Sequence, residues 1–128
     1  MGGIVMKCKE FQIGDWIQDE NGSPMRIIKV GRDYVCAIFG DNECPWAFED
    51  DDVQPEGIPI TPEILEKNGW WFNTEDMWLH DEVDFDIEKW DGRFQCYDIN
   101  QIKLDSVHEL QHALRLCGLD ELADNFKV

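Results

Sequence analysis

The sequence has no long apolar segment: no run of about 18 apolar residues, the length that marks a transmembrane helix, occurs in its 128 residues. Its first residues also lack the long apolar region of a secretory signal peptide. We therefore expect a soluble, cytoplasmic protein that does not associate with membranes. The five cysteines are widely spaced and contain no CxxC pair, which argues against a disulfide framework and against a thiolate zinc site. We expect reduced, mostly buried thiols at Cys8, Cys36, Cys44, Cys96 and Cys117.

Basic residues are nearly absent from the middle of the chain. Between Asp33 and Glu88 there are seventeen Asp or Glu residues and one basic residue, Lys67, so this stretch carries −16 of the formal net charge of −17. Such a concentration of like charge favours fast encounter with basic partners. It repels phosphates, and no basic stripe accompanies the aromatic residues, so direct nucleic-acid binding is disfavoured.

Hydrophobic residues make up 43% of the chain and include six Trp and seven Phe, which is enough to build a core. Residues 1–60 read as short strands separated by turn signals such as Asn21-Gly22, whose residues favour a hairpin turn. A sheet of such short strands must curl to bury one face, which predicts a small SH3-like β-barrel. The predicted strands are residues 11–18, 25–30, 34–39, 44–48 and 58–60.

Residues 61–128 predict a short helix, an antiparallel β-meander and a C-terminal amphipathic helix. Thr61-Pro62-Glu63 is typical of a helix start and Asn68-Gly69 of a helix end. Ser106 and Glu109 match a capping box ahead of a helix that ends at Gly118. The predicted strands are residues 70–73, 77–80, 83–90, 93–97 and 99–104. The predicted class is α+β, with the barrel and the second half packed as one compact unit.

Three segments resemble a known pattern: FQIGDWI at residues 11–17, IPITPEILEKNGW at residues 58–70 and VHELQHAL at residues 107–114. This arrangement is similar to that of a family of small uncharacterised proteins from phages, prophages and conjugative elements of Bacteroides-type bacteria. The family pattern runs RIGNWV, PIPLTEELLLKNGF and VHQLQN. The resemblance implies a mobile-element setting and no particular activity, so it transfers no catalytic residue.

One motif is typical of enzymes. Residues 108–112 read HELQH, and an HExxH helix places two histidines on one face as zinc ligands, with the glutamate as general base. Glu109 already has a structural role in the capping box, and the resembling family has Gln and Asn at the positions of Glu109 and His112. We interpret the match as coincidental and expect no cofactor and no catalysis. The alternative is a zinc-dependent hydrolase that uses His80, His108 and His112 as ligands and Glu109 as base.

Carboxylates form the other candidate site. Residues 83–90 alternate acidic and apolar side chains, so a strand there would place Asp84, Asp86 and Glu88 in a row on one face, about 6.7 Å apart. Exposed tryptophans beside acids bind cationic side chains by cation–π contact. The predicted partner-binding residues are Asp50, Asp51, Asp52, Asp81, Glu82, Asp84, Asp86, Glu88, Trp71 and Trp78.

These features predict a non-catalytic acidic protein that binds a basic protein, for example by occupying the basic groove of a host nucleic-acid-binding or defence protein. Two alternatives stay open at the level of the sequence. One is the zinc-dependent hydrolase, and the other is a small-molecule or peptide-binding module with a Trp-lined pocket.

Overall fold

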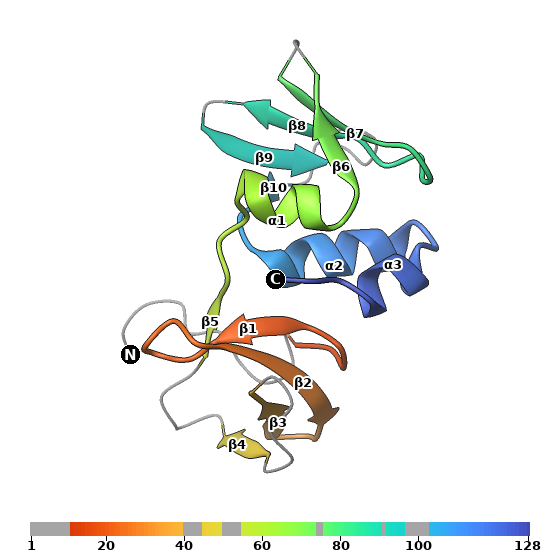
Figure 1. Cartoon of the computed structure of the whole chain (residues 1–128). Coiled ribbons are helices and arrows are strands. Elements are labelled where there is room, and N and C mark those ends of the chain that lie inside the picture. The colour runs from red at the N-terminus through yellow and green to blue at the C-terminus, as the bar shows by residue number, and fades with distance from the viewer. Residues whose placement is uncertain (1–10, 40–44, 50–54, 74–75, 91, 97–102) are drawn as a thin grey trace. The chain divides into compact units, whose positions relative to one another are not determined.

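The computed structural model describes residues 11–39, 45–49, 55–73, 76–90, 92–96 and 103–128 (Figure 1). The chain divides into two compact units, Met1–Ile58 (unit 1) and Pro59–Val128 (unit 2). Each unit contains a five-stranded sheet whose described strand pairs are antiparallel, and unit 2 also holds three short helices. The predicted α+β class is therefore confirmed.

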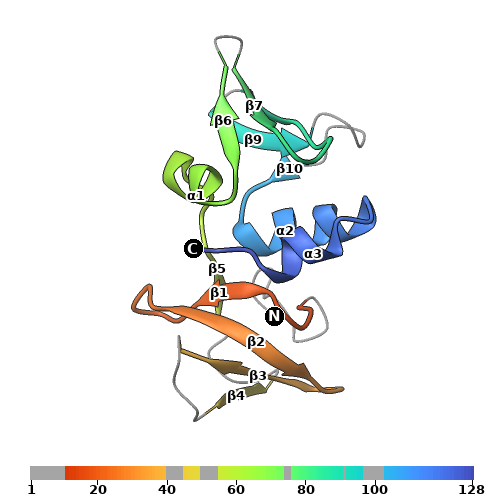
Figure 2. The ribbon, with the colours of Figure 1, turned by 45° about the vertical axis from the view of Figure 1, so that its right-hand side comes forward.

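The sheet of unit 1 has the strand order β4-β3-β2-β1-β5 and curls into a half-barrel (Figure 2). Alternate residues of β2 and β3 face inward, because successive side chains of a strand point to opposite faces. A register shift between Ile27 and Lys29 interrupts the pairing of β2 with β3, and such bulges increase the bend of a strand. The core consists of Phe11, Ile17, Met25, Ile27, Val35 and Ala37. The strands are β1 (Trp16–Gln18), β2 (Pro24–Val30), β3 (Tyr34–Ile38), β4 (Trp46–Glu49) and β5 (Glu56–Gly57).

Two predicted strands of unit 1 are placed differently. The strand predicted at residues 11–18 begins only at Trp16, because a turn precedes it in which Gly14 has φ +93° and Asp15 Oδ2 accepts the Gln12 N–H at 2.8 Å. The strand predicted at residues 58–60 is wrong. The fifth strand is β5, and Pro59 instead forms an isolated bridge with Ser106. Proline has no N–H to donate, so it does not continue a ladder.

The loop between β1 and β2 lies where the Asn21-Gly22 signal predicts a hairpin turn. Gln18 pairs with Pro24, so residues 19–23 form the loop. Asp19 organises it, because its Oδ1 accepts the backbone N–H of Asn21 at 2.9 Å and of Ser23 at 2.8 Å. The local side-chain acceptor outweighs the Asn-Gly signal, and Gly22 alone supplies a positive φ, of +83°.

The sheet of unit 2 has the order β10-β9-β8-β7-β6, so β6 lies at one end of it. Helices α2 and α3 lie side by side in both views (Figures 1 and 2). No described helix is long and apolar enough to cross a membrane. The strands are β6 (Trp70–Phe72), β7 (Met77–His80), β8 (Ile87–Trp90), β9 (Arg93–Cys96) and β10 (Lys103–Leu104), and the helices are α1 (Pro62–Lys67), α2 (Val107–Leu116) and α3 (Asp120–Asp124).

The predicted ends of α1 are confirmed. Thr61 Oγ1 accepts the Ile64 N–H at 3.2 Å, Pro62 opens the helix, and Asn68 ends it before Gly69, whose φ is +97°. The expectation of mostly buried thiols fails at Cys117, whose side chain is exposed just after the end of α2. Cys96 is buried and Cys36 half-buried, whereas Cys8 and Cys44 lie outside the described residues.

Candidate functional site

The HELQH segment lies in α2, directly after Ser106. The Ser106 Oγ lies 2.7 Å from Glu109 Oε1 and 3.1 Å from His108 Nδ1. Since an ionised carboxylate only accepts, the hydroxyl proton points to Glu109, and His108 Nδ1–H donates to the hydroxyl oxygen. A serine nucleophile needs the opposite direction, with the histidine accepting the serine proton. The three side chains therefore form a structural network.

This network also replaces the predicted capping box. The Ser106 side chain makes no capping hydrogen bond to the backbone at the start of α2. The pairing of the serine with a glutamate three residues later is present, but it joins the two side chains directly. The sequence pattern identified the partners correctly, and the prediction of their bonding to the backbone is wrong.

The three histidines do not gather round one point. His108 and His112 have ring centroids 5.7 Å apart. His80 is bonded elsewhere: its Nε2–H donates to Asn68 O at 2.8 Å, and its Nδ1 accepts the Glu82 N–H at 3.1 Å. Within the part of the chain that the structure describes, no group of three or more His, Cys, Asp or Glu side chains is placed to hold a metal ion. The predicted ligand set of the hydrolase alternative is therefore not assembled.

The predicted row of carboxylates is only partly a strand face. Strand β8 begins at Ile87, so Asp84 and Asp86 precede it and Glu88 alone lies within it. The carbonyl of Phe85 accepts the buried Trp70 indole N–H at 2.9 Å, which takes it away from any strand partner. The in-and-out pattern survives, because Phe85 is fully buried while Asp84 is exposed. A continuous acidic strand face at residues 83–90 is wrong.

The remaining predicted partner-binding residues differ in their exposure. Trp71 is 44% exposed, and its Nε1–H donates to Asp81 Oδ1 at 3.0 Å, so an indole and a carboxylate are joined at the surface. Trp78 is only 5% exposed and packs against Phe72, so little of its side chain is accessible in this structure. Asp81 and Glu82 are exposed in the turn after β7. The acidic run Asp50, Asp51 and Asp52 lies outside the described residues.

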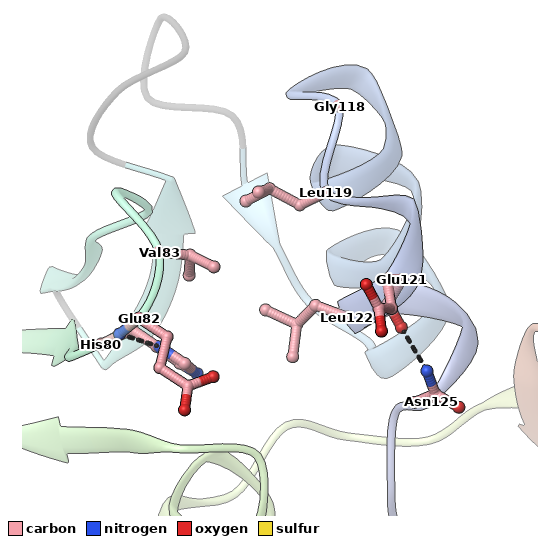
Figure 3. Close-up of a pocket in the computed structure, with 8 residues that line it drawn as sticks. All are labelled: His80, Glu82, Val83, Gly118, Leu119, Glu121, Leu122 and Asn125. Atoms are coloured by element: carbon pink, nitrogen blue, oxygen red, sulfur yellow. Dashed lines mark hydrogen bonds between the residues drawn. The ribbon is translucent and has the colours of Figure 1, made fainter.

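A pocket in unit 2 lies where this turn meets α3, and we call it the acidic groove (Figure 3). Val83 comes from the turn, and Leu119 and Leu122 come from the helical side. Figure 3 shows Val83 and Leu122 pointing toward each other across the gap. The volume of the cavity is about 400 Å³, and it is lined by His80, Glu82, Val83, Gly118, Leu119, Glu121, Leu122 and Asn125.

The charges of the acidic groove are of one sign. Glu82 belongs to the turn and Glu121 to α3, so a carboxylate stands on each wall. The ring nitrogens of His80 are both engaged, since Nε2–H donates to Asn68 O and Nδ1 accepts the Glu82 N–H. No lysine or arginine is among the described residues that line this cavity. Each of the two facing sides of the groove therefore carries both an apolar side chain and a carboxylate.

A second hollow adjoins the acidic groove. It measures about 470 Å³ and shares His80, Glu82, Leu122 and Asn125 with the groove. Its other lining residues are more polar, and they include two lysines. They are Lys67, Asn68, Gly69, Asp81 and Lys127. The acidic groove is therefore the more anionic end of a longer depression within unit 2.

Asn68 supports the walls of this depression. Its side-chain Nδ2 donates to Ile64 O and to Lys127 O, both at 2.8 Å, and its Oδ1 accepts the Lys127 N–H at 2.8 Å. Its backbone carbonyl accepts the His80 Nε2–H. One residue at the end of α1 thus holds both the last residues of the chain and the histidine that lines the groove.

The buried Trp70 ring packs against the His80 imidazole. Their ring centroids are 4.8 Å apart at an angle of 76°, and Trp70 also contacts the rings of Phe85 and Phe126. Gly69 is a close neighbour, because a Cβ placed on it would lie 2.4 Å from His80 Nε2. The imidazole therefore has little room to move.

Sequence reasoning identified Glu82 but missed the residues from the opposite wall, Leu119, Glu121, Leu122 and Asn125. Nothing in their spacing indicates which carboxylates they meet, because that depends on the turn after β7. No protein-family model, curated protein or solved structure matches the chain.

Proposed function

We propose that this chain is a non-catalytic protein that binds a basic protein, and that the acidic groove receives a lysine or arginine side chain of that partner. The observation that carries the proposal is that each of the two facing sides of the groove combines an apolar side chain with a carboxylate. Long cationic side chains have the matching form, since an apolar stem ends in a charged head. The stem would contact Val83 and Leu122, and the head would meet Glu82 and Glu121.

The charge of the whole chain supports this function. A formal net charge of −17 produces a field that attracts basic proteins and raises their rate of encounter. Asp81 and Asp84 add exposed carboxylates in the same turn that supplies Glu82. Trp71, bonded to Asp81, offers an aromatic face beside them. We propose that these side chains form the rim of the contact.

The fold and setting belong to the same proposal. The curled antiparallel sheet of unit 1 is compatible with an SH3-like barrel, a scaffold whose functions lie in its surface. The resemblance to proteins of phages and conjugative elements favours a host protein as the target. A host nucleic-acid-binding or defence protein with a basic groove is the partner class that we propose.

The groove can be tested with a short basic probe. An acetylated peptide of alternating lysine and glycine is titrated into the whole protein by isothermal calorimetry at low and at high salt. The double variant Glu82→Gln with Glu121→Gln should bind about tenfold more weakly, because two exposed ionic contacts are worth roughly 0.5–1 kcal/mol each. Binding should also weaken as salt rises.

The matched control removes the same charge elsewhere. Glu56→Gln with Glu66→Gln alters two exposed carboxylates that line neither the groove nor its adjoining hollow. This variant should bind within about twofold of the parent. Equal losses in the two double variants would mean that the probe senses only net charge, and the groove would then have no special role.

A further inference from the structure

Unit 1 contains a second hollow with a different lining. It measures about 250 Å³ and lies between the β1–β2 loop and the strands β3 and β4. Its aromatic side is formed by Phe39, Trp46 and Phe48, and its acidic side by Asp19 and Glu20. Since all these residues belong to unit 1, this pocket is independent of the acidic groove of unit 2. We call it the aromatic pocket.

The aromatic side is rigid at its base and open at its rim. Phe39 and Phe48 are half-buried and pack against the core of unit 1. Trp46 is 58% exposed, and its ring stands at 88° to that of Phe39, with centroids 6.1 Å apart. The two perpendicular rings form a corner, and both rings line the cavity. A large exposed aromatic in such a corner is typical of a binding surface.

The acidic side is also fixed in place. Asp19 holds the β1–β2 loop through its hydrogen bonds to Asn21 and Ser23. This arrangement presents the next residue, Glu20, as an exposed carboxylate on the rim of the cavity. No lysine or arginine is among the described residues that line the pocket, so its negative charge is not balanced locally.

The same unit already pairs cations with aromatic rings. Arg26 lies over the Trp16 ring with its Cζ 5.9 Å from the centroid, and Lys29 lies over the Tyr34 ring with its Nζ 5.7 Å away. In both cases the chain supplies its own cation. The aromatic pocket has the ring and the carboxylates, but its described lining supplies no cation. The pocket therefore resembles these two cation–aromatic pairs, except that the cationic side chain would have to come from another polypeptide.

We infer that the aromatic pocket binds an arginine side chain of another polypeptide, with the guanidinium against the Trp46 ring and hydrogen-bonded to Glu20. Arginine fits better than lysine for two reasons. Its planar guanidinium stacks on an aromatic face, and its fork of N–H donors matches a carboxylate. Lysine offers a more strongly hydrated point charge, which is costlier to bring into an aromatic corner.

The test uses the whole protein and three small probes: the acetylated, amidated tripeptides Gly-Arg-Gly, Gly-Lys-Gly and Gly-citrulline-Gly. Binding is followed by nuclear magnetic resonance through the Trp46 indole N–H signal, which is assigned from its loss in Trp46→Phe. The arginine peptide should shift this signal in a saturable way. The lysine peptide should bind at least threefold more weakly, and the citrulline peptide should produce no shift, because it lacks the charge.

Two variants locate the site. Glu20→Gln should weaken binding of the arginine peptide about threefold to fivefold, which corresponds to one exposed ionic contact. Glu56→Gln, an exposed carboxylate of the same unit outside the pocket, should leave binding unchanged. Trp46→Ala should weaken binding of the arginine peptide by a similar factor. If the alanine variant misfolds, Glu20→Gln alone still tests the site.

The inference is overturned if the Trp46 signal does not move, if the lysine peptide binds as tightly as the arginine peptide, or if Glu20→Gln behaves like Glu56→Gln. These outcomes do not bear on the acidic groove. Its variants, Glu82→Gln with Glu121→Gln, should leave the Trp46 titration with the arginine peptide unchanged, whereas Glu20→Gln should leave the groove unaltered.

Discussion

Replacing Gly69 with alanine should destabilise unit 2 far more than its exposure suggests. A Cβ at this position would lie 2.4 Å from His80 Nε2 and 3.0 Å from His80 Cε1, so the imidazole must move. This movement breaks two hydrogen bonds of His80. One is donated by its Nε2–H to Asn68 O, and the other is accepted by its Nδ1 from the Glu82 N–H. It also disturbs the contact of the imidazole with the Trp70 ring.

The magnitude follows from these separate losses. Alanine at a φ of +97° costs roughly 1–2 kcal/mol of backbone strain. Each lost hydrogen bond costs about 1 kcal/mol, and the ring contact is worth about 0.5–1.5 kcal/mol. The free energy of unfolding should therefore fall by about 3.5–5.5 kcal/mol, a large share of the total for a small domain.

Gly92 provides the matched control, because its φ is +75° and, apart from its chain neighbours, no heavy atom of the described residues lies within 4 Å of a Cβ built on it. Gly92→Ala should therefore show the backbone strain alone, about 1–2 kcal/mol. The two free energies of unfolding are measured by urea denaturation followed by tryptophan fluorescence. The difference between the variants, about 2.5–3.5 kcal/mol, reports the steric conflict with His80.

A double-mutant cycle tests the cause. In the His80→Ala background the imidazole is absent, so Gly69→Ala should cost no more than Gly92→Ala does in the parent. A Gly69→Ala variant as stable as Gly92→Ala would refute the reasoning. A cost that persists unchanged after His80→Ala would refute it as well, because the conflict would then lie with another group.

Two further stability comparisons follow from buried hydrogen bonds. Trp70→Phe should destabilise the protein by about 2 kcal/mol more than Trp78→Phe. The Trp70 indole N–H donates to Phe85 O, whereas the Trp78 indole N–H has no partner among the described residues. Asn68→Ala should release the last residues of the chain, since it removes both bonds to Lys127, and should lower the free energy of unfolding by about 2–4 kcal/mol.

The same urea titrations measure both tryptophan variants, and equal losses would contradict the assignment of the Trp70 bond. For Asn68→Ala, hydrogen exchange at the Lys127 amide gives a local readout, and exchange as slow as in the parent would contradict it. Asn125→Ala is the control, because among the described residues the Asn125 side chain bonds locally, to Glu121 O of the helix that it ends.

The sequence predicted local features of the fold well where one residue type decides them. Helix α1 begins and ends where the sequence predicts, after Thr61 and before Asn68. The Thr61 side chain satisfies a backbone N–H of the first turn, and Pro62 has no N–H that would need a partner there. Trp70 and Trp71 point to opposite sides, as adjacent strand residues must, with exposures of 2% and 44%.

The errors arose where a distant residue competes for the backbone. Residues 83–86 have the alternation of a strand, but the Trp70 indole bonds to the Phe85 carbonyl. Residues 58–60 have the composition of a strand, but the bridge of Pro59 is to Ser106, far along the sequence. A periodic pattern carries no information about either partner.

The candidate sites were the least predictable part. Glu82 was expected to bind a partner, but its facing residues Glu121 and Leu122 come from a terminal helix that gave no such signal. Phe39, Trp46 and Glu20 are spread over strands and a loop, and only the curl of the sheet brings them to one cavity. Pockets of this kind are a property of the tertiary arrangement, so residue spacing does not reveal them.

The position of β6 at the end of its sheet has a consequence for colloidal behaviour. Trp71 and Phe72 are 44% and 50% exposed there, so this edge would adhere to a second copy if nothing kept the copies apart. The net charge of −17 makes copies of the chain repel one another, which prevents this association. A cationic partner cancels this charge, so turbidity should peak where the mixture approaches charge neutrality and clear again when either component is in excess.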